Sequence, residues 1–100
     1  MPQITLKMDR LLRRSSGADA TGLEATPVTI WEGESILDLV RRLAAEDAVF
    51  RNDIHDAKHQ MIETNIVVAL NGCVVNPNER SSTILRDGDE VIFISMYYGG

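Results

Sequence analysis

Alternating polar and apolar positions open the chain. In Gln3–Met8 the apolar side chains recur at every second residue, which predicts a half-buried strand. A second strand is predicted over Ala25–Trp31, where β-branched residues gather. Residues 15–22 hold no large apolar side chain, so 13–24 is expected to form an exposed loop at the tip of a hairpin.

A helical pattern follows Ser35. Ser35 and Asp38 have the spacing of a capping box, which marks a helix start. Apolar residues then recur at helical spacing, at Ile36, Leu39, Val40 and Leu43. The pattern predicts a helix over Ile36–Asp47. Residues 48–63 give no clear pattern and are read as either a further turn of helix or an irregular segment.

The second half of the chain reads as strands separated by turns. Ile66–Leu70 is a continuous apolar run, as expected of a central strand. Asn71-Gly72 favours a two-residue hairpin turn into a returning strand at Cys73–Val75. Asp87–Asp89 predicts a tight turn before the last strand, Val91–Met96.

This order of elements predicts an α+β fold. A hairpin, one helix and three further strands form a mixed four- to five-stranded sheet with the helix on one face. The first and last strands are long and apolar, so we expect them side by side at the centre, which is the β-grasp arrangement. The expected core residues are Ile4, Leu6, Ile36, Val40, Leu43, Val67, Ala69, Val91 and Phe93. Residues 1–96 are expected to form one domain, and 97–100 are expected to form a flexible tail.

Charge narrows the range of partners. The net charge of −5 argues against nucleic-acid binding, which needs clustered Lys and Arg. Residues 1–14 carry +3 and the remainder −8, which suits either a partner with a basic surface or simple solubility. With no apolar run long enough to span a bilayer and no leader pattern at Met1, we expect a cytoplasmic protein without a membrane partner.

The sequence ends in Tyr97, Tyr98, Gly99 and Gly100. Gly99 has no Cβ and can adopt backbone angles closed to other residues, so such a tail can thread into a narrow site on a partner. Nothing shields a carboxylate on Gly100 from attack. By itself, a Gly-Gly end is also what an ordinary frayed terminus would show.

Four stretches together carry a family resemblance. They are SILDLVRRLAAEDAVF (35–50), NIVVALNGCVV (65–75), TILRDGDEVIFI (83–94) and Gly99-Gly100. In this order they resemble the ubiquitin-like sulfur carriers, most closely the small subunit of molybdopterin synthase. They are also similar to the sulfur carrier of the thiamine pathway. The resemblance implies the β-grasp fold and a reactive tail.

The family chemistry gives each tail residue a role. An E1-like adenylating enzyme would use ATP to join AMP to the Gly100 carboxylate. Gly99, which has no side chain, would let the tail enter that enzyme's narrow active site. A persulfide sulfur donor would then displace AMP and leave a C-terminal thiocarboxylate. The large subunit of molybdopterin synthase, or an equivalent acceptor, would take the sulfur. The carrier would bind no cofactor and would not be an enzyme alone. Tyr97 and Tyr98 would either contact a partner or end the last strand.

Two other classes of function remain open on the sequence. A covalent protein modifier would use the same tail to form isopeptide bonds with lysines, and an interaction module would have an inactive tail. His55 and His59 lie four apart, but without a third ligand a solvated polar segment is favoured over a metal pair. Cys73 is interpreted as a small packed apolar residue, and Arg41 and Arg42 as a solvated helix face.

Overall fold

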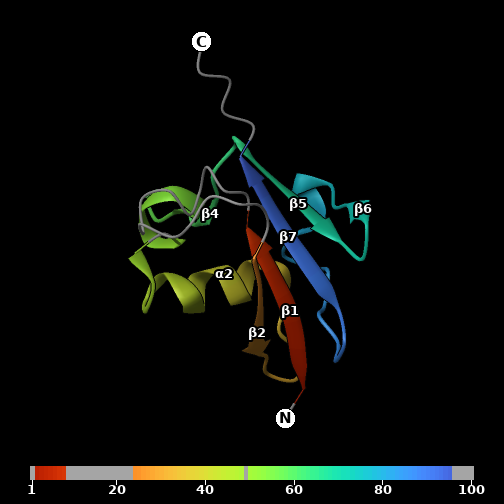
Figure 1. Ribbon diagram of the computed structural model, residues 1–100. Helices are drawn as coiled ribbons and strands as arrows, with labels where there is room; N and C mark the ends of the chain where they lie inside the picture. Colours follow the sequence, from red (N-terminus) through yellow and green to blue (C-terminus); the bar gives the residue numbers. More distant parts are fainter. Residues whose placement is uncertain (1, 9–23, 49, 96–100) are drawn as a thin grey trace.

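The computed structural model describes residues 2–8, 24–48 and 50–95 (Figure 1). The elements are β1 (Gln3–Met8), β2 (Glu24–Thr29), α2 (Ile36–Ala44), the π-helical turn η2 (Phe50–Ile54), β3 (His55–Asp56), β4 (Met61–Ile62), β5 (Ile66–Leu70), β6 (Cys73–Val74), the 3-10 turn η3 (Pro77–Glu79) and β7 (Glu90–Ser95). The predicted exposed loop lies almost wholly outside the described residues, as do Tyr97, Tyr98, Gly99 and Gly100. No helix in the described part of the chain is long and apolar enough to cross a membrane.

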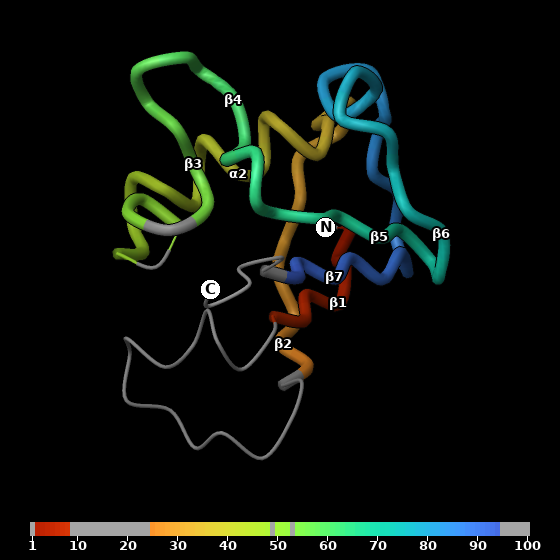
Figure 2. Tube along the Cα trace, turned by 90° about the horizontal axis from the view of Figure 1, so that it is seen from above, coloured from red at the N-terminus to blue at the C-terminus, as the bar shows by residue number. Residues whose placement is uncertain are grey.

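The main sheet has five strands in the order β2-β1-β7-β5-β6. β1 and β7 pair in parallel at the centre, as predicted, with Leu6 opposite Val91 and Met8 opposite Phe93. The other neighbours pair antiparallel. Helix α2 crosses one face of this sheet, which lies in front of it in Figure 1 and below it in Figure 2. The mixed sheet with one main helix confirms the predicted β-grasp class.

Local turn chemistry is confirmed at two places. The Asn71-Gly72 turn has positive φ at both residues, 50° and 87°, as the hairpin requires. At the start of α2, the Ser35 Oγ accepts from the Asp38 amide at 3.1 Å, and the Asp38 carboxylate accepts from the Ser35 amide at 3.3 Å. This capping box fixes the helix start.

The helix ends at Ala44, three residues before the predicted end at Asp47. The amides of Ala45 and Glu46 donate to the carbonyls three residues before them, those of Arg42 and Leu43, which tightens the chain and ends the regular helix. Arg51 then reaches back, and its Nε donates to the Ala44 carbonyl at 3.0 Å. A side chain from the next segment therefore satisfies a helix-end acceptor.

The core lies between α2 and the sheet. It contains Ile4, Leu6, Met8, Ile30, Ile36, Leu39, Val40, Ala44, Phe50, Ile54, Ile62, Ile66, Val68, Leu85, Val91 and Phe93. Leu43 is only partly buried at its edge. Ala69 is buried as predicted, but the prediction was wrong for Val67, which is only partly buried because β5 presents Ile66 and Val68 to the helix. The register explains this, since Val68 lies opposite the buried Phe93.

Residues 50–62 form the part of the core that the sequence left undefined. Here η2 leads into a second, two-stranded sheet of β3 and β4. Phe50, Ile54 and Ile62 are all buried, and the Phe50 ring packs edge-on against Phe93, with centroids 5.6 Å apart and an interplanar angle of 86°. This contact joins the segment to the central strand.

Candidate functional site: the outer face of the sheet and the base of the tail

The predicted reactive residues, Gly99 and Gly100, lie outside the described residues, as do Tyr97 and Tyr98. The structure instead shows how the chain leading to them is held. β7 is flanked by β1 and β5, and Ser95 at its end pairs with Ile66. Residues 96–100 therefore follow a strand that is paired with β1 as far as Phe93 and with β5 as far as Ser95.

An apolar strip occupies the face of the sheet turned away from α2. We call this surface the outer face and define it by Val67, Val74, Ile92 and Ile94. The register brings the strip together, since Val67 lies opposite Ile94, and the buried Ala69 lies opposite Ile92 on one side and Val74 on the other. None of the four belongs to the core cluster, and Val74 is 71% exposed. Apolar side chains gathered in this way are typical of a protein-binding surface.

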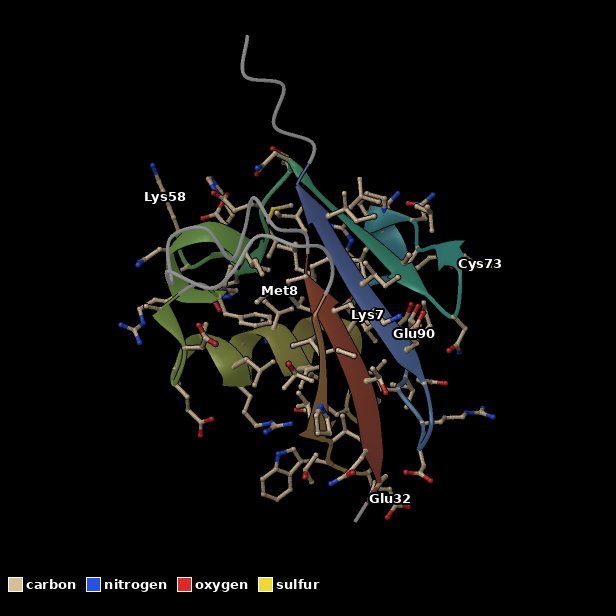
Figure 3. All side chains as sticks on the ribbon, in the orientation of Figure 1. Lys7, Met8, Glu32, Lys58, Cys73 and Glu90 are labelled. Atoms are coloured by element: carbon tan, nitrogen blue, oxygen red, sulfur yellow. The ribbon has the colours of Figure 1, made fainter. Side chains whose placement is uncertain are left out.

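A charged pair borders the outer face. The Lys7 Nζ lies 3.0 Å from a Glu90 carboxylate oxygen, and both side chains are shown in Figure 3. Their strand positions place them beside Ile92, because Lys7 pairs with Ile92 and Glu90 precedes Val91. A partly exposed ion pair of this kind contributes little to stability. It gives the strip a polar rim, as protein interfaces commonly have.

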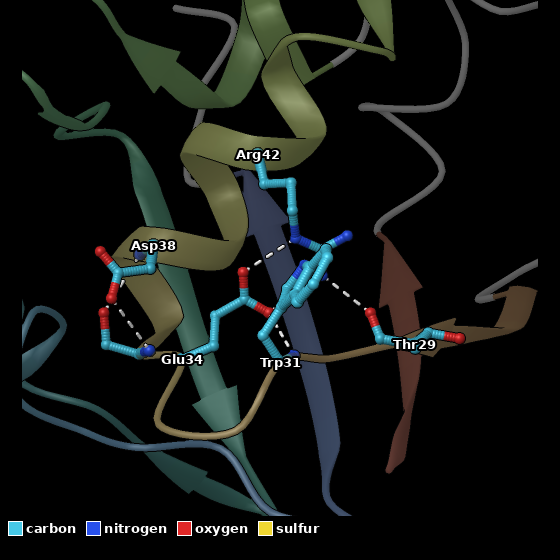
Figure 4. A network of polar contacts seen from close by, with 6 residues as sticks. Thr29, Trp31, Glu34, Asp38 and Arg42 are labelled. Atoms are coloured by element: carbon cyan, nitrogen blue, oxygen red, sulfur yellow. Dashed lines mark hydrogen bonds and ion pairs between the residues drawn. The ribbon is translucent and has the colours of Figure 1, made fainter. Parts of the chain in front are cut away.

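A polar network between the last turn of α2 and the β2–α2 connection corrects the interpretation of Arg42. Its Nε and Nη2 each lie 2.9 Å from a different Glu34 oxygen, and Nη2 also donates to the Thr29 carbonyl at 2.7 Å (Figure 4). Glu34 is buried and accepts from the Trp31 amide, while the Arg42 guanidinium stacks on the Trp31 ring. The hydrogen bond to Glu34 raises the pKa of Arg42. Arg42 therefore locks the β2–α2 connection, whereas Arg41 is exposed as predicted.

The two histidines do not share a helix face. His55 lies in β3 and His59 in the turn that follows, where its Nδ1 is 2.7 Å from an Asp56 oxygen. That hydrogen bond lowers the pKa of Asp56. His55 Nε2 is buried with no hydrogen-bond partner. Within the described ranges, no three His, Cys, Asp or Glu side chains are grouped to hold a metal ion.

Cys73 is exposed on the edge strand β6, so its interpretation as a small packed apolar residue was wrong. The sequence also missed the outer face as a surface, because Val67 had been assigned to the core. The readable signal was the alternation in β7, where Val91 and Phe93 point inward and Ile92 and Ile94 must point outward.

Fold and site together define a small ubiquitin-like β-grasp protein with an apolar sheet face beside the base of its C-terminal segment. The model of the ThiS family matches residues 18–100, and the chain belongs to that family. This agrees with the ubiquitin-like sulfur carriers that the sequence resembles. No curated protein matches the chain.

Solved structures show the same fold at low sequence identity. SAMP1 from Haloferax volcanii superimposes with a TM-score of 0.74 at 15% identity, over 98% of this chain and 99% of that one. A putative molybdopterin converting factor subunit 1 from Pyrococcus furiosus gives 0.66 at 19% identity, over 97% and 100%. Urm1 from Trypanosoma brucei gives 0.63 at 24% identity, over 99% and 96%.

Proposed function

We propose that this protein is a sulfur carrier whose Gly100 carboxylate is converted to a thiocarboxylate. The observation that carries the proposal is the family match, which extends through the Gly99-Gly100 pair to residue 100. The anchored β7 and the outer face support it. A carrier needs a rigid surface to dock on an enzyme and a side-chain-poor end to enter that enzyme's active site.

The chemistry proceeds in two steps on enzymes other than the carrier. An E1-like adenylating enzyme transfers AMP from ATP to the Gly100 carboxylate and releases pyrophosphate. Sulfide, or the terminal sulfur of a donor protein's persulfide, attacks the activated carbonyl and displaces AMP. With a persulfide, a second thiol then cleaves the new S–S bond, which leaves the thiocarboxylate and a disulfide.

The carrier contributes position rather than catalytic groups. Docking through the outer face makes attack at Gly100 effectively intramolecular, an effect that can supply several kcal/mol. Ordering the segment opposes this by roughly 1–2 kcal/mol per residue. For the five residues 96–100 this cost is about 5–10 kcal/mol, so a short tail is preferable to a long one. Tyr97 and Tyr98 would meet the walls of the partner's channel.

The pathway we propose is molybdopterin, or tungstopterin, biosynthesis, with the large subunit of molybdopterin synthase as the sulfur acceptor. The family match favours a second candidate, a carrier for thiamine or another sulfur-containing metabolite. A third use of the same activated tail is covalent attachment to lysines. In each case the carrier holds no cofactor of its own.

The test begins with the purified chain, its adenylating enzyme, ATP and sulfide. The mass should rise by the difference between sulfur and oxygen, and fragmentation should place the gain on Gly100. Deleting the gene in the native host then separates the pathways. Loss of molybdenum-cofactor-dependent activity supports the first candidate, and a thiamine requirement supports the second. Ladders on target lysines with no free thiocarboxylate would support a modifier and contradict the carrier.

A further inference from the structure

A second surface lies on the helix side of the sheet, away from the outer face. A cavity of about 260 Å³ opens between α2, β4 and the η3 region. Leu37, Met61, Ile62 and Pro77 supply its apolar lining. Its volume is near the lower limit of ligand pockets and suits one large side chain.

Arg80 also lines this cavity. It is 7% exposed and is the one buried cation among the described residues. Its Nη2 donates to the Ile66 carbonyl at 2.7 Å, and this is the one hydrogen bond that its guanidinium makes within the described ranges. Nε is buried without an acceptor. Desolvation lowers the pKa of Arg80, and no carboxylate in the described part of the chain pairs with it.

A buried guanidinium with unused donors is energetically unfavourable unless something pairs with it. The planar fork of an arginine matches a carboxylate in geometry and charge. A free inorganic anion would satisfy the charge but would gain nothing from the four apolar residues. A segment that carries a carboxylate beside an apolar side chain would satisfy both parts of the cavity.

We propose that this cavity docks an acidic-apolar segment of a partner protein, with the apolar side chain between Leu37, Met61 and Ile62 and a neighbouring carboxylate paired with Arg80. Because the cavity and the outer face lie on opposite sides of the sheet, such a partner could bind while the outer face is occupied. The inference does not depend on thiocarboxylate chemistry, and its test is direct binding.

The probe is a short capped peptide containing Phe-Asp, added to the full ¹⁵N-labelled chain. Matched peptides carry Phe-Asn or Ala-Asp, and acetate and inorganic phosphate serve as free anions. The Phe-Asp peptide should cause saturable shifts at the amides of Leu37, Ile62 and Ser81. It should bind about tenfold more tightly than either matched peptide, since each of these lacks one of the two contacts.

Met61→Glu places a like charge at the rim of the cavity and should weaken Phe-Asp binding about tenfold. Ile84→Glu is the matched control, because Ile84 is also an exposed apolar residue, at 45%, but does not line the cavity. Arg80→Met tests the cation directly, with folding checked by the amide spectrum. If Arg80→Met unfolds, Met61→Glu still tests the proposal.

Three results would overturn the proposal. One is no saturable shift at about 10 mM Phe-Asp peptide. Another is equal binding of the Phe-Asn peptide, because the carboxylate would then be irrelevant. The third is equal binding of acetate or phosphate at the same amides, which would make the cavity a small-anion site.

Discussion

Arg42 holds Glu34 with two parallel hydrogen bonds, each 2.9 Å long, across the connection between β2 and α2. The Glu34 carboxylate is almost fully buried, while the Arg42 side chain is 29% exposed. The pair fixes where the helix begins relative to the hairpin, and it also orients the exposed Trp31.

Breaking this pair should destabilise the fold. Arg42→Lys removes the planar guanidinium. The lysine can replace at most one of the two side-chain hydrogen bonds that Arg42 donates to the buried Glu34, and it loses the bond to the Thr29 carbonyl. We expect a loss of about 1–3 kcal/mol in the free energy of unfolding by urea. Arg41→Lys is the matched control, since Arg41 is exposed on the same helix and should change stability by less than ~0.5 kcal/mol. Equal losses in the two variants would contradict the role given to Arg42.

The register of β5 can be tested with two adjacent valines. Val68→Ala empties space beside Phe93 in the core and should cost about 2 kcal/mol or more. Val67→Ala, on the outer face, should cost less than about 1 kcal/mol. Urea unfolding measures both, and a reversed order would show that the strand presents the other face to the helix.

The helix face predicts a graded loss of stability. Leu39 is fully buried, so Leu39→Ala should cost about 2–5 kcal/mol. Leu43 is only partly buried at the edge of the core, and Leu43→Ala should cost less than Leu39→Ala. A larger loss for Leu43→Ala in urea unfolding would mean that the helix is rotated from its described position.

The Asp56–His59 contact predicts a local pH dependence. The His59 side-chain hydrogen bond lowers the pKa of Asp56 below 3.8, helped by the amides of His59 and Lys58. Because the folded pKa is depressed, the contact is present above pH 3.8 and is lost as the pH falls through the folded value. NMR titration of the Asp56 carboxyl should show this. His59→Ala should move the pKa partly back toward 3.8, while His55→Ala should leave it unchanged.

If the outer face docks the adenylating enzyme, a charge placed on it should slow charging without unfolding the carrier. Val74→Glu should lower the charging efficiency, kcat/KM, about tenfold. Ile84→Glu is again the control, since Ile84 is exposed but lies outside the outer face. Equal rates for Val74→Glu and the parent would remove the outer face from the mechanism.

The tail prediction rests on crowding at the reacting carbon. Gly100→Ala should keep the parent melting temperature but form thiocarboxylate far more slowly, because a methyl group crowds the carbonyl and the channel that admits it. One residue added after Gly100 should abolish charging by moving the carboxylate out of register. Mass spectrometry measures both, and undiminished charging of the extended variant, without trimming, would falsify the tail mechanism.

Local features of this protein were determined by the sequence alone. The capping box at Ser35, the turn at Asn71-Gly72 and the alternation in β1 each depend on residues a few positions apart. Steric limits and hydrogen bonds within each segment determine these features, whatever the position of the segment in the folded protein. With the central pairing of the first and last strands, they were enough to predict the β-grasp fold. The terminal Gly-Gly pair likewise pointed to the proposed chemistry.

Only the tertiary structure decided which face of β5 is buried, because a continuous apolar run has no alternation to read. Pairing with β7 settles it by placing Val68 opposite Phe93 and leaving Val67 on the outer face. The same holds for Phe50, whose burial depends on a ring 43 positions away in the chain, and for Arg80, whose charge is buried beside β5. These features arise from contacts between segments far apart in sequence, so no local pattern could predict them.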